Sequence, residues 1–131
     1  MLSTLKRYAP ALIMMVIIFV LSSQPSSNLP NFNWADKFVK KCGHVIGYGL
    51  LALSYLRVFY ANKRRYWLAW SLAILYAITD EIHQSFVSTR HPSVWDVVVF
   101  DDLGAIAALF LYHHYWKQDA NVSRGSNSRA G

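Results

Sequence analysis

Four long apolar stretches constrain this chain more than any other feature of its sequence. They cover residues 8–22, 39–60, 66–86 and 93–116. Each comes near the length that a helix needs to cross a hydrocarbon core about 30 Å thick. Turn-rich, basic or proline-containing segments separate them. The pattern predicts an all-α fold, a transmembrane bundle of about four helices.

The composition agrees with a membrane protein. Hydrophobic residues make up 54% of the 131 residues and charged residues only 15%. A water-soluble chain of this length would have to bury nearly all of that apolar surface in one small core, whereas a bilayer accepts it as lipid-facing surface. The single Cys42 excludes a disulfide framework within the chain and is expected to pack as a small hydrophobe.

The basic residues flank the apolar stretches. The net charge is +6, yet no basic stripe interleaved with surface aromatics is present, so no nucleic-acid partner is expected. With both termini in the cytoplasm, nine of the 13 Lys and Arg residues lie inside, and six of the seven acidic residues lie outside. This distribution predicts a multi-pass protein of the cell inner (cytoplasmic) membrane.

The chain divides into two parts. Residues 1–118 are predicted to form the four-helix transmembrane domain, and residues 119–131, rich in Ser, Asn, Arg and Gly, a disordered cytoplasmic tail. Lys6 and Arg7 before an apolar run also resemble the start of a cleavable signal peptide. No good small-x-small cleavage site follows Leu21, so we favour a retained first span.

Ionisable side chains from three of the predicted helices fall at one depth near the outer side. At about 1.5 Å per residue, Asp80 and Glu81 stop roughly 10 Å short of the outer surface. Asp101 and His44 lie at a similar depth on the fourth and second stretches. An ionised side chain at the bilayer centre costs about 2.5 to 3.5 kcal/mol on insertion scales. These groups are therefore expected to face the bundle interior.

Helical spacing supports that interior position. One polar stripe recurs at i, i+4, i+7 and i+11, and a second at i, i+4 and i+8. The stripes consist of Lys37, Lys41, His44 and Tyr48, and of Tyr76, Asp80 and Gln84. Small-xxx-small pairs, Gly43 with Gly47 and Gly104 with Ala108, are expected to let the helices approach closely.

The polar groups admit three interpretations. Carboxylates crowded at low dielectric, with a His or Arg nearby, suit general acid and base work. A structural ion-pair network among Asp80, Glu81, His44 and Arg90 would instead tether the helices. A metal site could draw on His44, His83 or His91 with carboxylates, but no zinc-type spacing supports it, so neither a metal nor another cofactor is expected.

The residues that carry these groups resemble the VanZ-like family of small membrane proteins. The resemblance runs from about Leu21 to Ala108. It consists of Ser22-Ser23-Gln24-Pro25, Asp36-Lys37 with His44 and Tyr48, Asp80-Glu81-x-x-Gln84-x-Phe86, Arg90, Ser93, Asp96, and the stretch from Asp101 to Gly104. It implies a protein of the membrane and cell envelope, in a family whose name-giving member is associated with teicoplanin resistance. It implies no particular reaction.

The sequence leads to one functional hypothesis and two rivals. The leading one is an outward-facing pocket that binds, and in its fuller form modifies, an anionic lipid or lipid-linked cell-envelope intermediate. The rivals are a non-enzymatic scaffold or partner-binding protein, and a small proton-coupled transporter. Four short helices leave little room for a large ligand, so a homodimer or lateral lipid access would help to enclose it.

Each site residue has an expected role. Acid, base and proton-partner roles go to Glu81, Asp80 and His44. Cationic contacts to the ligand go to Lys37 and Arg90. The remaining substrate-binding positions are Gln84, Asp96, Tyr48 and Asp101.

Overall fold

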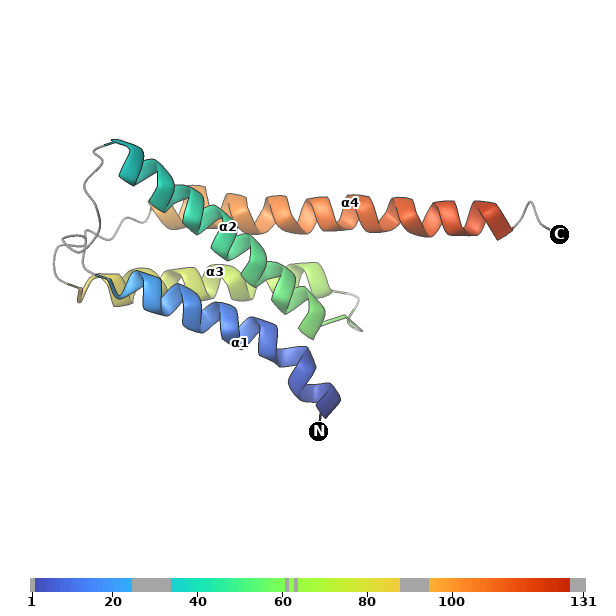
Figure 1. Cartoon of the computed structure of the whole chain (residues 1–131), viewed down its shortest axis with the longest axis horizontal. Coiled ribbons are helices and arrows are strands. Elements are labelled where there is room, and N and C mark those ends of the chain that lie inside the picture. Colours follow the sequence, from blue (N-terminus) through green and yellow to red (C-terminus); the bar gives the residue numbers. More distant parts are fainter. Residues whose placement is uncertain (1, 25–33, 61, 63, 88–94, 128–131) are drawn as a thin grey trace.

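The computed structural model is all-α, as the sequence predicts, and describes residues 2–24, 34–60, 62, 64–87 and 95–127. Four α-helices and one π-helical segment make up this part of the chain (Figure 1). They are α1 (Leu2–Ser22), α2 (Trp34–Val58), α3 (Arg65–Gln84), η2 (Asp96–Asp101) and α4 (Asp102–Asn127).

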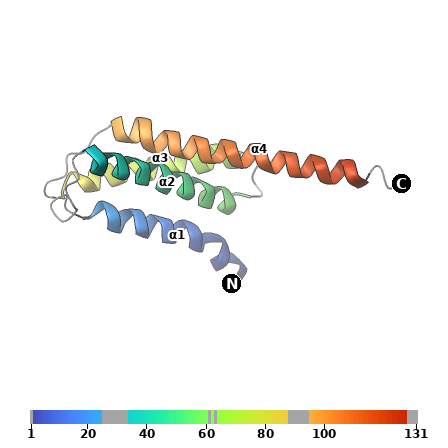
Figure 2. The same ribbon diagram turned by 45° about the horizontal axis from the view of Figure 1, so that its top comes forward.

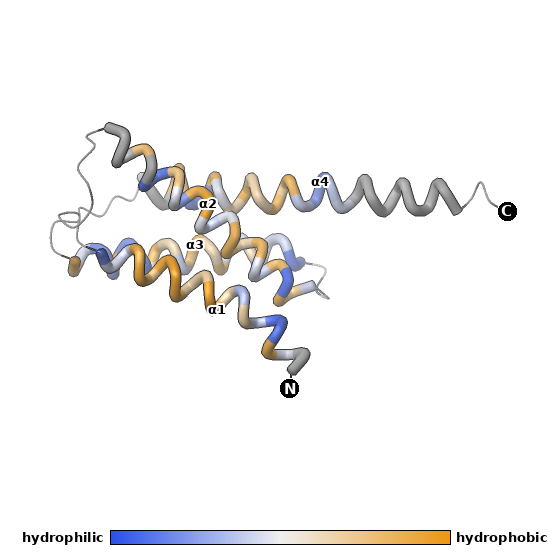
Figure 3. Tube along the Cα trace, in the orientation of Figure 1, coloured by the Kyte–Doolittle hydropathy of each residue, from blue (hydrophilic) through white to orange (hydrophobic). Residues whose placement is uncertain are grey.

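Successive helices run in opposite directions, so both termini lie toward the same side of the bundle (Figures 1 and 2). We call the end where α1 and α3 begin and α2 ends the terminal end. The end where α1 and α3 finish and α2 and η2 begin is the network end. Polar residues gather toward these two ends, whereas the middle of α1 is strongly apolar (Figure 3).

Helix α2 is the centre of the bundle, since it contacts α1, α3, η2 and α4. Its neighbours meet it through small side chains. The α3 face turned inward consists of Ala69, Ala73, Ala77, Asp80 and Gln84, spaced by three or four residues as one helical face requires. Alanine at these positions lets backbones approach closely, which is how helices associate when lipid supplies no hydrophobic driving force.

The tightest approach joins α2 to α4. A Cβ on Gly104 would collide with the backbone of Val45, and a Cβ on Gly49 would lie 3.1 Å from the carbonyl oxygen of Gly104 and 3.3 Å from the Cβ of Ala108. The predicted role of Gly104 and Ala108 in close packing is thus confirmed. The partner on α2 is Gly49. Gly47 packs against Ile18 of α1, and no atom described lies within 4 Å of a Cβ on Gly43.

One helix in the described part of the chain is long and apolar enough by itself to cross a membrane, the segment Thr4–Ser22. The other helices carry charged and polar residues along the stripes noted above. Large apolar side chains are nevertheless exposed on every helix, among them Ile13, Ile46, Ile82 and Phe110. Each of the four α-helices therefore contributes exposed apolar side chains to the surface of the bundle.

The fourth helical region begins with the π-helical turn η2, which the apolar pattern of the stretch from residue 93 does not reveal. Helix α4 then runs from Asp102 to Asn127, and no proline interrupts it. A helix already formed extends at the cost of ordering one residue for each hydrogen bond gained. The division into a transmembrane domain over residues 1–118 and a disordered tail over residues 119–131 stays a prediction.

Candidate functional site

The carboxylate of Asp80 joins three helices at the network end. Its Oδ2 accepts hydrogen bonds from the hydroxyl of Ser22 on α1 (2.8 Å), the hydroxyl of Tyr48 on α2 (3.2 Å) and the Nε2 of Gln84 on α3 (2.9 Å). Asp80 is 4% exposed, and Tyr48 and Gln84 are buried with it. The donors to this oxygen among the described residues are therefore all neutral.

The second carboxylate oxygen of Asp80 is in a different position. Oδ1 is also buried, yet it has no hydrogen-bond partner among the described residues. A buried acceptor without a partner costs free energy, roughly 1 to 3 kcal/mol, and calls for an explanation. A donor from a bound molecule would reduce that cost.

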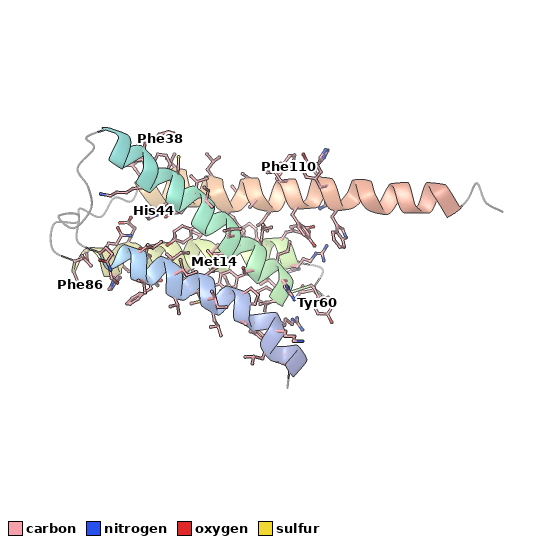
Figure 4. The ribbon with its side chains drawn as sticks, in the orientation of Figure 1. Met14, Phe38, His44, Tyr60, Phe86 and Phe110 are labelled. Atoms are coloured by element: carbon pink, nitrogen blue, oxygen red, sulfur yellow. The ribbon has the colours of Figure 1, made fainter. Side chains whose placement is uncertain are left out.

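A second buried acid, Asp101, pairs with a histidine. Nδ1 of His44 lies 3.1 Å from Oδ1 of Asp101, and Asp101 is 1% exposed while the His44 side chain is 23% exposed. When Asp101 is ionised, the hydrogen bond requires the proton on Nδ1, which fixes the orientation of the imidazole ring. Figure 4 shows His44 on α2 toward the network end, whereas Tyr60 lies at the terminal end.

Tyr48 connects the two acids. Its ring stacks on that of His44 with centroids 6.0 Å apart, while its hydroxyl bonds Asp80. The resulting chain of contacts, which we call the polar network, runs through all four helical regions. Its members are Ser22, Gln84, Asp80, Tyr48, His44 and Asp101.

The sequence prediction and the structure agree on much of this geometry. Asp80, Gln84, Tyr48, His44 and Asp101 come together in the polar network. Their roles in binding or chemistry stay predictions. The expected tether is present in altered form, since His44 pairs with Asp101 and Asp80 with neutral donors.

Other predicted residues lie beside the network or outside the described part. Glu81 is half-buried on α3, one position from Asp80 and turned away from the Oδ2 cluster by about 100° of helix rotation. Arg90 lies outside the described residues, as do the side chains of Lys37 and Asp96. The amine of Lys41 lies 4.3 Å from the ring centre of Phe100.

Sequence reasoning left Ser22 and Ser23 out of the site. Ser22 bonds Asp80, and the hydroxyl of Ser23 lies 3.0 Å from Nε2 of His83. Both serines end the first apolar stretch, so the change from apolar to polar residues there was the available signal. What it could not give was the partner, since Ser22 and Asp80 are 58 residues apart.

The arrangement suits proton handling and hydrogen bonding more than metal binding. Within the described ranges, no group of three or more His, Cys, Asp and Glu side chains is close enough to hold a metal ion. The network instead offers two buried carboxylates, a histidine and a tyrosine hydroxyl in sequence. Such groups can accept hydrogen bonds from a polar ligand and hold or pass a proton.

The described part of the chain is an all-α bundle with exposed apolar side chains on each helix, one candidate membrane span and a buried acid network at one end. The chain belongs to the VanZ/LLP1 family, whose model matches residues 8–117. This confirms the resemblance seen in the sequence. Neither the curated proteins nor the solved structures yield a match to this chain.

Proposed function

We propose that the chain spans the cytoplasmic membrane with all four helices, both termini inside, and binds the head group of an anionic lipid or lipid-linked envelope intermediate at its network end. The unpartnered Oδ1 of Asp80 carries the proposal, because a buried acceptor among neutral donors is suited to one more donor. Sugar or glycerol hydroxyls of such head groups are donors of that kind.

The four spans are supported by exposure of apolar side chains on each helix. Ile13 on α1 is 57% exposed, Ile46 on α2 62%, Ile82 on α3 57% and Phe110 on α4 66%. In water these surfaces would favour aggregation, whereas lipid solvates them. The charged residues of α2 and α3 make each of these helices less apolar than a single membrane-spanning helix. Because the polar network is buried on their inner faces, the two helices can enter the membrane as part of one bundle.

The proposal concerns binding of the head group, and a chemical reaction on the bound ligand is its second part. Lys37 and Arg90 would contact the phosphate, and Glu81 or Asp80 would act as acid or base with His44 as the proton partner. The His44 and Asp101 pair supports the last role, since a carboxylate on Nδ1 orients the ring.

The test uses Asp80→Asn, which keeps an oxygen for the three donors and replaces the other carboxylate oxygen by an amide. A polyprenyl phosphate, with and without an attached sugar, is the probe, and native mass spectrometry of the detergent-solubilised protein is the readout. We expect wild-type protein to retain the sugar-linked probe and Asp80→Asn to bind it about tenfold more weakly, which corresponds to one hydrogen bond to a charged group.

Asp102→Asn is the matched control, because Asp102 accepts a hydrogen bond from the Nε1 of Trp70 at 2.6 Å and an amide oxygen can replace it. Equal binding by wild type, Asp80→Asn and Asp102→Asn would exclude the proposed site. The variants Glu81→Gln and His44→Gln test the chemical roles, with chemical conversion of the bound probe as the readout. If both variants convert the probe as fast as the wild type does, Glu81 and His44 take no part in the chemistry.

A second candidate is a purely structural role for the network in assembling the bundle or a partner complex. It is favoured by the bonds from Ser22, Tyr48 and Gln84, which tie α1, α2 and α3 to one oxygen of Asp80. This role predicts that any loss of function in the variants follows the loss of thermal stability in detergent. Ligand binding predicts loss of binding in Asp80→Asn at nearly unchanged stability.

A further inference from the structure

A cavity at the terminal end is lined by cations from two helices. Thr4, Lys6 and Arg7 of α1 and Arg57 and Tyr60 at the end of α2 surround a space of about 410 Å³. None of these lining residues is acidic. The three positive charges are thus gathered around one hollow, at the opposite end of the bundle from Asp80.

Arg7 builds the wall of this cavity. Its Nε donates to the carbonyl oxygen of Val58 at 2.7 Å, and a second guanidinium nitrogen contacts the same oxygen. The guanidinium carbon lies 4.6 Å from the ring centre of Tyr60. Val58 is the last residue of α2, so Arg7 satisfies a carbonyl that has no partner within the helix and holds α1 against α2.

The remaining polar groups of the cavity face outward. Lys6, Arg57 and Tyr60 are exposed, while Arg7 is half-buried. Two cations and a phenol hydroxyl are therefore presented to a molecule in the cavity, with Arg7 fixed behind them. Together they can donate several hydrogen bonds to one phosphate group.

The level of the cavity fits a lipid head group. The apolar span of α1 begins at Thr4, so the lining residues lie at the boundary between hydrocarbon and water. Leu5, between Thr4 and Lys6 in the chain, is 64% exposed and suits contact with acyl chains. A ligand with a phosphate at this boundary and an apolar body beneath it matches both surfaces.

We propose that this terminal-end cavity binds the phosphate of an anionic phospholipid in the leaflet on the side of the termini. Lys6 and Arg57 contact the phosphate oxygens, and the Tyr60 hydroxyl completes the site. The site needs insertion of α1 into a bilayer but does not depend on the ligand proposed for the network end. The two proposals can therefore fail separately.

The experiment measures phosphatidylglycerol retained by the full chain. The protein is exchanged into nanodiscs that contain phosphatidylglycerol and phosphatidylcholine, released into detergent, and examined by native mass spectrometry. We expect wild-type protein to retain phosphatidylglycerol in preference to phosphatidylcholine. Each charge-assisted hydrogen bond to the phosphate contributes about tenfold in affinity, so Lys6→Gln should lose about tenfold and Lys6→Gln with Arg57→Gln roughly 100-fold.

Arg64→Gln is the control, because it removes one exposed positive charge from the same end without touching the cavity. An equal loss in Arg64→Gln would overturn the proposal in favour of general charge attraction. Inorganic phosphate at millimolar concentration is added as a competitor for the cavity. If it displaces the bound lipid as effectively as added phosphatidylglycerol does, the ligand is a free phosphate and the proposed lipid ligand is overturned. Unchanged retention in Lys6→Gln and in the double variant would exclude the site itself. No hydrogen bond or ion pair joins Lys6 to another of the described residues, so we expect the single variant to fold and to stay informative if the double variant misfolds.

Discussion

The two ends of the bundle treat charge in opposite ways. At the network end, Asp80 and Asp101 are buried and bonded to specific donors. At the terminal end, Lys6 and Arg57 are exposed around an open cavity. A buried charge is tolerated only with partners in fixed geometry, whereas an exposed one can remain hydrated until a ligand arrives. The comparison predicts that truncating a buried acid at the network end costs stability, whereas neutralising an exposed cation at the terminal end costs mainly binding.

The largest effect is expected from Asp80→Ala. It leaves the hydroxyls of Ser22 and Tyr48 and the amide of Gln84 buried without their acceptor. We expect a loss of about 3 to 5 kcal/mol in the free energy of unfolding, because each buried donor left without an acceptor costs roughly 1 to 3 kcal/mol. Unfolding of the purified protein in mixed detergent and SDS micelles measures it. A loss below about 1 kcal/mol would mean that this end is not held by the network.

Gly104→Ala tests the close packing beside the network. Its Cβ would meet the backbone of Val45, including a Cα 2.9 Å away, so α2 and α4 must move apart. We expect a loss of about 1 to 3 kcal/mol in the same unfolding assay. Gly43→Ala is the matched control, because a Cβ there meets no described atom within 4 Å. Equal losses in the two variants would contradict the assigned helix crossing.

The pair of His44 and Asp101 should give a measurable coupling. His44→Ala and Asp101→Ala each remove one partner of the 3.1 Å contact, and the double variant removes both. We expect a coupling energy of about 1.5 to 3 kcal/mol, as for a hydrogen bond to a charged group. A double-mutant cycle in the unfolding assay provides the number. Strict additivity would show that the two side chains do not stabilise one another.

The smallest effects are expected at the terminal end. Arg7→Gln removes the hydrogen bonds to Val58 and the contact with the Tyr60 ring, so we expect a loss of about 1 kcal/mol. Lys6→Gln should leave stability unchanged within error while reducing lipid retention. Thermal unfolding with and without phosphatidylglycerol separates the two variants. A large loss of thermal stability in Lys6→Gln, measured without lipid, would contradict the predicted difference between the two ends.

Residue spacing predicted much of the candidate site. Asp80 and Gln84 share a helical face, and their side chains do meet at 2.9 Å. His44 and Tyr48, one turn apart on α2, stack as the same spacing suggests. The helix repeat determines such pairs before any tertiary contact forms. Spacing within one helix does not determine the functional roles of these residues.

What the sequence alone determined is the set of helices, their apolar surface and the polar face that each turns inward, because these follow from composition and a period of 3.6 residues. The tertiary structure decided the partners. It joined Asp80 to Ser22 across 58 residues, paired His44 with Asp101, and set Gly49 rather than Gly43 against α4. Those choices depend on how far each helix is rotated and shifted along its neighbour. Steric fit between small residues determines this rotation and this shift, and neither can be predicted from a local sequence pattern.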